Sequence, residues 1–197
     1  MTLEIVQTGT PVLRRVAREL SVEEILSDST QRLIEEMRDT MREAPGVGLA
    51  APQIGEPLQL AVIEDRSDYL EGASPAQLAA QQRSVVDFHV IINPRLFYVG
   101  DETVDFYEGC LSVTGFGALV SRSIRVRVEC LNERAEPITI NAQGWYARIL
   151  QHEIDHLNGT LYIDRMQTRS FTTMENVDRF WRGQSIDEIQ KELAIKS

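Results

Sequence analysis

The sequence predicts an α+β fold, in which antiparallel β-sheets pack around one central helix that carries an HExxH motif and is a candidate metal-binding element. The 197 residues suit a single domain. Strand-like segments occupy much of the middle of the chain, and the motif lies on one late helix. Strands followed by a single late helix are typical of α+β proteins, with that helix packed on antiparallel sheet.

The first quarter of the chain is expected to be mainly helical. Thr10 followed by Pro11 resembles a helix start, which predicts a short helix over 12–17. A second helix is predicted over 30–43, with Asp28 or Ser29 as its cap. Its apolar residues recur at three- and four-residue spacing, as core packing requires: Leu33, Ile34, Met37, Met41 and Ala44. The segment 46–55, rich in glycine and proline, is interpreted as a loop.

Strands are predicted in the middle of the chain. Residues 58–64 and 89–93 have strand patterns, and 95–103 can continue as strand and turn. Apolar and charged side chains alternate over 124–130, which predicts a strand with one buried face, and residues 137–140 are expected to pair with it. The polar segment 65–87 is predicted to be a surface insertion with a small helix starting at Ser74 and Pro75.

Two helices are predicted in the last third. The first spans 143–157 and is ended by Asn158 and Gly159, a good C-terminal stop. Ser185 and Glu188 form a capping-box pattern that opens a final helix reaching about Ile195.

The composition narrows the function classes. A formal net charge of −10 repels phosphate backbones, so no direct DNA binding is expected. No apolar run approaches the roughly 20 residues that cross a bilayer, so no membrane association is expected. The N-terminus resembles neither a secretory signal nor a transit peptide, which predicts a cytoplasmic location. Two cysteines form no disulfide framework, and Cys130 is expected to be a buried structural thiol.

The HExxH motif points to metal-assisted hydrolysis. His152 and His156 are four residues apart, so both imidazoles lie on one helix face and can reach one divalent ion. Glu153 lies beside them, where its carboxylate can act on a water molecule without binding the metal. The remaining histidine, His89, has no partner in the sequence and is expected to be structural or exposed.

Such a site needs a third protein ligand. Metalloproteases usually take it downstream of the motif, where Glu175 is a candidate in a setting without a recognisable pattern. Upstream, Cys110 follows a glycine, which lets a thiolate come close to an ion. A lone cysteine is more often a small buried thiol, but the HExxH motif and the lack of a downstream histidine favour Cys110.

Three separated motifs resemble those of the peptide deformylase family. They are GVGLAAPQ (46–53), EGCLS (108–112) and QHEIDHLNG (151–159), in the family's order and spacing. The similarity extends from about Thr8 to Met166. It implies a deformylase-like catalytic domain over 1–170, and 171–197 is then a C-terminal extension that adds a helix to the same domain. Thr114 departs from the family, which often has proline there.

The resemblance implies an enzyme that removes the formyl group from N-formylmethionine of newly synthesised polypeptides, acting at the ribosome, and releases formate. Cys110, His152 and His156 would hold one divalent ion, Fe²⁺ in vivo, with Zn²⁺, Ni²⁺ or Co²⁺ as alternatives. Glu153 would accept a proton from water and return it to the departing amine. The oxyanion would be stabilised by two donors, the side-chain amide of Gln53 and the backbone N–H of Leu111.

The resemblance also implies where substrate lies. Gly46, Val47 and Gly48 would face the substrate main chain, and Ile149, with Val47 and Trp145, would line the methionine pocket. Arg122 and Asp155 are expected to form an ion pair that holds the Cys110 loop against the helix.

Two alternatives remain at this point. The first is a zincin-type endopeptidase that uses His152, His156 and Glu175 as ligands. The second is a non-catalytic relative that binds formylated or other N-termini, or ribosomes. An intact Glu153 and Gln53 argue against the second, because a pure binder needs no general base.

Overall fold

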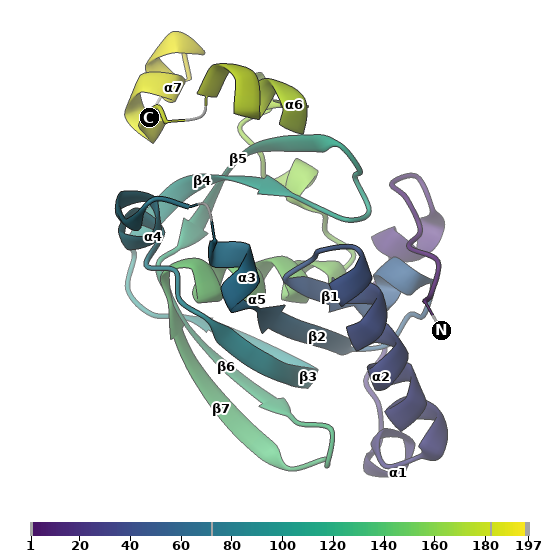
Figure 1. Ribbon diagram of the computed structural model, residues 1–197. Coiled ribbons are helices and arrows are strands. Elements are labelled where there is room, and N and C mark those ends of the chain that lie inside the picture. The colour runs from purple at the N-terminus through teal and green to yellow at the C-terminus, as the bar shows by residue number, and fades with distance from the viewer. Residues whose placement is uncertain (1, 72, 182, 196–197) are drawn as a thin grey trace.

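The computed structural model describes residues 2–71, 73–181 and 183–195. Within these ranges, helix α5 (Gly144–Leu157) lies between two antiparallel sheets (Figure 1). The larger sheet has the strand order β1-β2-β3-β6-β7 and the smaller one β4-β5-β8. This arrangement confirms the predicted α+β class, with antiparallel sheets around the HExxH helix.

The strands of the larger sheet are β1 (Gly48–Ala50), β2 (Leu60–Asp65), β3 (Val86–Tyr98), β6 (Arg125–Leu131) and β7 (Pro137–Gln143). Those of the smaller sheet are β4 (Thr103–Gly109), β5 (Phe116–Ser123) and β8 (Thr172–Thr173). The pairing of β6 with β7, from Arg125↔Gln143 to Leu131↔Pro137, confirms the predicted partner of the alternating strand.

The other α-helices are α1 (Val22–Ile25), α2 (Asp28–Glu43), α3 (Ser67–Leu70), α4 (Pro75–Gln81), α6 (Met174–Asn176) and α7 (Ile186–Glu192). The 3₁₀ helices are η1 (Pro11–Arg14), η2 (Ala51–Ile54), η3 (Tyr162–Asp164) and η4 (Thr168–Ser170), and η5 (Val177–Trp181) is a π-helical turn. No helix in the described ranges combines the length and the apolar character that a membrane crossing requires.

Two layers of core explain the strand patterns. Strand β2 is buried on both faces, because α5 covers one face and α2 the other, so its residues form a continuous apolar run. Strand β6 contributes Val126, Val128 and Cys130 to the core under α5, and the alternating residues Arg125 and Arg127 are exposed. A third cluster, with Leu13, Val120 and Tyr162, lies at the smaller sheet.

Several element predictions were wrong in detail. Segment 46–55 is not a loop throughout, because it contains β1 and η2. The N-terminal helix is a 3₁₀ turn over Pro11–Arg14 and does not reach residue 17. Helix α2 is capped by Ser27, whose side chain accepts from the Thr30 N–H, and not by Asp28 or Ser29. The small helix predicted to start at Ser74 and Pro75 is present as α4, and the predicted capping box at Ser185 is present, but α7 ends at Glu192 and not near Ile195.

The hairpin of β4 and β5 was missed. Most side chains of β4 are partly covered, so the strand lacks a clean alternation between core and solvent. Strand β3 is also longer than predicted, since it runs through an irregularity between Ile92 and Arg95, where Asn93 has a φ of 51°. The hairpin matters for function because the loop that joins its two strands carries Cys110.

Candidate metal centre

Three side chains from distant parts of the sequence meet at one end of a cleft. The ligand atoms of Cys110, His152 and His156 all lie within 4.8 Å of one another. Cys110 comes from the β4–β5 loop and both histidines from α5. The four-residue spacing puts the two rings on one face of α5, with centroids 5.0 Å apart. The fold therefore brings together the three residues predicted as ligands.

The geometry fits a divalent transition metal. The Cys110 Sγ lies 3.3 Å from the His156 Nε2. Two ligand atoms at tetrahedral positions around zinc would be about 3.5 Å apart, given bond lengths of about 2.3 Å to sulfur and 2.0 Å to nitrogen. The His152 Nδ1 is occupied by a carboxylate, which leaves its Nε2 for an ion. One thiolate and two imidazoles suit zinc, iron, nickel or cobalt.

Electrostatics also favour a cation here. Burial holds the pKa of His156 well below its usual value, so this ring is neutral, the form that binds metals. Burial acts in the same direction at His152, but hydrogen bonds with Cys110 and Glu108 raise the pKa of His152 well above its usual value. The Cys110 sulfur and the Glu108 carboxylate thus both interact with the His152 ring.

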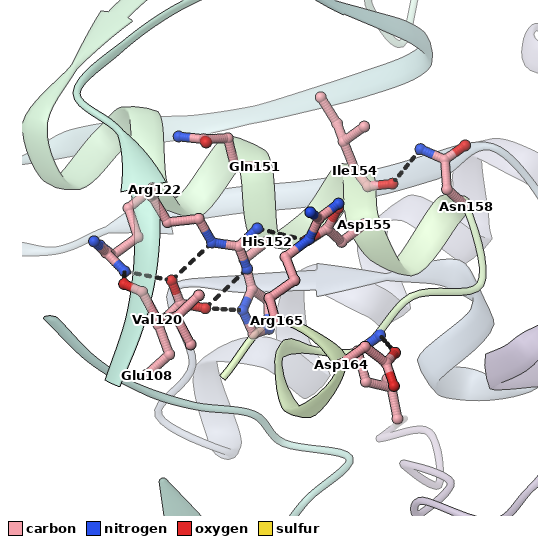
Figure 2. Close-up of polar contacts among 12 residues, drawn as sticks. Glu108, Val120, Arg122, Gln151, His152, Ile154, Asp155, Asn158, Asp164 and Arg165 are labelled. Atoms are coloured by element: carbon pink, nitrogen blue, oxygen red, sulfur yellow. Dashed lines mark hydrogen bonds and ion pairs between the residues drawn. The ribbon is translucent and has the colours of Figure 1, made fainter. Parts of the chain in front are cut away.

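A network of buried charged residues holds His152 in place through its Nδ1 atom (Figure 2). Glu108, 5% exposed, accepts two hydrogen bonds of 2.9 Å from Arg122 and one of 2.6 Å from Arg148, and its Oε2 lies 3.0 Å from the His152 Nδ1. Burial alone would raise the pKa of Glu108, yet the hydrogen bonds from His152 and Arg122 hold it well below its usual range. Glu108 is therefore an anion that fixes the orientation of the His152 ring.

The sequence reasoning missed the roles of Glu108 and Arg148. Two local signals could have indicated them: Glu108 lies two residues before Cys110, and Arg148 lies one helical turn before His152 on α5. The expected pair of Arg122 and Asp155 is present, with Nη1 2.5 Å from Oδ2. Figure 2 shows that Arg122 thereby bridges the hairpin and α5, since it contacts Glu108 as well.

The carboxylate of Glu153 is buried beside the histidines. The side chain is 3% exposed, and burial raises its pKa to about 7. Among the described residues its Oε2 has no hydrogen-bond partner. A Cβ added at Gly48 would lie 2.2 Å from the Glu153 Oε1. Glycine is therefore required at position 48 to accommodate the carboxylate, a reason that the sequence alone did not supply.

The amide of Gln53 is oriented by a fixed network. Gln53 is 2% exposed, and its Oε1 accepts a 2.9 Å hydrogen bond from the Ala50 N–H. Its Nε2 therefore points toward the centre, 3.3 Å from the Ser112 Oγ and 3.5 Å from the Cys110 Sγ. The Leu111 N–H makes no hydrogen bond within the described part of the chain. The Gln53 amide is thus a donor next to the Cys110 sulfur, and the N–H of Leu111 belongs to the residue that follows Cys110.

A cleft of about 420 Å³ adjoins these groups. Its wall includes the four residues predicted to bind substrate, together with residues that the prediction lacked. The predicted ones are Gly46, Val47, Gly48 and Ile149, and the additional ones are Tyr107, Phe116 and Met174. Within the described ranges, strand β1 is an edge strand that pairs only with β2, so its other edge is open for main-chain pairing with a ligand.

Other singled-out residues lie outside the centre. His89 binds the Tyr146 hydroxyl at 2.9 Å through Nε2, and burial lowers its pKa, so it has a structural contact as expected. Cys130 is 7% exposed, and burial raises its pKa to about 11. Glu175 is an exposed residue of α6 and is not in the ligand group. Thr114 donates to the Gln7 Oε1 at 2.9 Å, which tethers the loop without a proline.

Comparisons with known proteins agree with this geometry. A family model described as "Polypeptide deformylase" matches residues 2–171. "Peptide deformylase 1A, chloroplastic" of Solanum lycopersicum is 50% identical over 175 residues, which are 89% of this chain and 63% of the relative. "Peptide deformylase 1A, chloroplastic/mitochondrial" of Arabidopsis thaliana is 48% identical over 89% of this chain and 65% of its own length. The chain thus spans slightly less than two thirds of either plant relative.

A solved structure with the same fold is the Met-Ala-Ser-bound class I type b peptide deformylase from Acinetobacter baumannii. It has a TM-score of 0.75 and 31% sequence identity, and the match covers 84% of this chain and 99% of that one. The residues matched by the family model include both the β4–β5 hairpin and α5.

Proposed function

Because this chain belongs to the polypeptide deformylase family, we propose that it removes the N-formyl group from N-formylmethionine of newly synthesised polypeptides and releases formate. The observation that carries the proposal is the meeting of Cys110, His152 and His156 beside a buried glutamate and a fixed amide donor. The substrate would be the emerging chain at the ribosome. The cytoplasmic location expected from the sequence stays a prediction.

Cys110, His152 and His156 would hold one divalent ion, with Fe²⁺ as the physiological ion and Zn²⁺, Ni²⁺ or Co²⁺ as substitutes. Such an ion supplies Lewis acidity and makes water a nucleophile near neutral pH. Glu108 keeps the His152 Nε2 available by occupying Nδ1. The ligand set would thereby be preorganised by a residue that is not itself a ligand.

Glu153 would accept the proton of the attacking water and deliver it to the departing amine nitrogen. Its Oε2 is unpartnered among the described residues, and the side chain lines the cleft beside His152. The contact of Oε1 with Gly48 limits the positions available to the carboxylate. Glu153 can therefore act as the base without being a fourth protein ligand.

Gln53 and Leu111 would stabilise the oxyanion that forms when the formyl carbon becomes tetrahedral. The Gln53 carbonyl is held by the Ala50 N–H, so the donor end of the amide cannot turn away from the centre without losing that bond. Losing one such donor typically lowers the rate by 10²- to 10³-fold. The open edge of β1 would align the substrate main chain along Gly46, Val47 and Gly48, with Ile149 in the wall that receives the methionine side chain.

The test is formate release from formyl-Met-Ala-Ser by protein loaded with Fe²⁺ under anaerobic conditions. We expect turnover that depends on the metal. A fully metal-loaded sample that binds the peptide but releases no formate would instead indicate a non-catalytic relative. Cleavage of internal peptide bonds without formate release would indicate the endopeptidase.

A further inference from the structure

The chain continues past the family match and returns to the cleft. Residues 172–173 form β8, which pairs with β5 through Phe116↔Thr173 and Gly117↔Thr172. The Met174 N–H then donates a 2.9 Å hydrogen bond to the Gly115 carbonyl. In Figure 1, α6, which begins at Met174, lies beyond β5 on the side away from the larger sheet. The position of Met174 is thus set by backbone pairing.

The segment of the chain that precedes β8 is also held in place by hydrogen bonds. The Gln167 N–H donates 2.9 Å to the Leu119 carbonyl, and the Ser170 Oγ accepts 2.8 Å from the Leu119 N–H. Ser170 is 1% exposed. The segment leading into Met174 is therefore held along β5 over most of the strand.

Two glycines that lie opposite each other leave room for the Met174 sulfur. Gly109 of β4 lies directly across from Gly117 of β5. A Cβ added at Gly117 would lie 2.7 Å from the Met174 Sδ, and one added at Gly109 would lie 4.0 Å from it. The missing side chains leave a depression that the thioether occupies. Gly109 directly precedes Cys110, so the sulfur lies next to the loop that carries the metal ligand.

An exposed apolar cluster, which we call the rim, is formed by Met174, Phe116 and Phe171. Met174 and Phe116 both line the cleft, and they are 39% and 40% exposed. Phe116 stacks on Phe171, which is 41% exposed, at 5.1 Å between ring centroids and 8° between planes. Apolar side chains gathered at the mouth of a cleft are typical of a binding surface. Methionine suits such a role because its flexible thioether adapts to different partners.

We propose that Met174 and Phe116 form the contact surface for the second and third side chains of the substrate peptide and favour large apolar residues there. The inference rests on the proposed function and adds specificity-determining residues, one of them from the C-terminal extension. The first side chain of the substrate, that of the formylmethionine, would pack against the part of the cleft wall that includes Ile149, which is only 3% exposed. The rim is more open, so it is accessible to residues that follow the first.

The test compares formyl-Met-Ala-Ser with peptides that carry leucine at position two or position three. We expect Met174→Ala to lower kcat/KM for at least one leucine peptide about three- to tenfold more than for the alanine–serine peptide, mainly through KM. This range lies at the low end for one apolar contact because the rim is partly open to solvent. Met174→Leu keeps the apolar surface and should retain the preference.

A matched control is Leu26→Ala, which removes another exposed apolar side chain, 54% exposed at the end of α1. A second readout is calorimetric binding of the deformylated peptides Met-Leu-Ser and Met-Ala-Ser to zinc-loaded protein. Met174→Ala should reduce the difference in affinity between them by a similar factor if position two is the contact.

The outcomes separate the two proposals. If wild type releases no formate from any peptide, the proposed function fails, and the binding series still reports on the rim. If wild type is active but shows no preference for leucine at either position, or if Met174→Ala keeps the wild-type preference, the inference is overturned. An equal loss of kcat on all peptides would also overturn it, because that result would show that Met174 only supports the Cys110 loop.

Discussion

Substitution of Gly48 by alanine tests how closely the Glu153 carboxylate is positioned. The added Cβ would lie 2.2 Å from Oε1, 2.5 Å from Cδ and 2.8 Å from Cγ of Glu153. Since real Cβ contacts rarely fall below 3.0 Å, the carboxylate must move by about 1 Å. A displacement of that size typically lowers a rate by about 10²-fold. Overpacking a buried site also costs about 1–3 kcal/mol of folding free energy.

Deformylation kinetics and urea unfolding of Gly48→Ala measure both effects. We expect kcat to fall by about 10²-fold with metal content unchanged, because Glu153 is not a ligand. Gly46→Ala is a matched control for stability, since the one close contact of its Cβ would be the end of the Leu111 side chain, with Cδ1 at 2.9 Å, while the Gly48 carbonyl oxygen would lie at an ordinary 3.5 Å. That flexible end can move, so Gly46→Ala should cost less folding free energy than Gly48→Ala; the comparison is made by urea unfolding, because Gly46 itself is proposed to face the substrate.

A double-mutant cycle separates the steric clash from a general effect of the added methyl group. In the Glu153→Ala background the clashing atoms are absent, so Gly48→Ala should cost little stability there. An equal loss of stability in both backgrounds would refute the reasoning. So would a Gly48→Ala enzyme whose kcat stays within about fivefold of wild type, because the carboxylate would then have another working position.

Three further predictions follow from the same geometry. Glu153→Ala should keep its metal and lose about 10²- to 10⁴-fold in kcat, measured by metal analysis and formate release; loss of the metal would show that Glu153 is a ligand. Cys110→Ser should lose Fe²⁺ while Glu175→Ala keeps it, and the reverse result would favour the endopeptidase. Glu108→Gln should lower the free energy of unfolding by about 3–5 kcal/mol because buried Arg148 loses its anion and buried Arg122 keeps only Asp155, whereas Glu102→Gln, in an exposed pair with Arg125, should change it little.

The parts of the fold that local sequence determines were predicted well. The bounds of α5 and the shared face of His152 and His156 follow from helical spacing and a glycine stop, which involve only neighbouring residues. The strand over 124–130 was recognised because one of its faces is solvated. Strand β4 was missed because its partial burial gives no period that a sequence can display.

The candidate site depended on contacts between distant residues, which no spacing rule provides. Cys110 lies 46 positions before His156, and the two were connected before the structure only by the lack of a downstream histidine and by the family resemblance. Glu108 and Arg148 were overlooked because charged residues are usually solvated, and their burial becomes evident only when the hairpin is placed on α5. Met174 could not be assigned, since it lies outside the motifs and enters the cleft through pairing between β8 and β5.

The buried charges explain how two separate elements produce one site. Burying carboxylates and arginines is expensive, and an apolar replacement is often as stable. Arg122 and Arg148 are 4% and 3% exposed, and they are balanced by Glu108 and Asp155. An apolar cluster would hold the hairpin on α5 equally well, but it could not accept a hydrogen bond from the His152 Nδ1. The network therefore makes sense as a positioning device, because a single carboxylate both anchors the loop that carries the Cys110 sulfur and orients the His152 ring toward it.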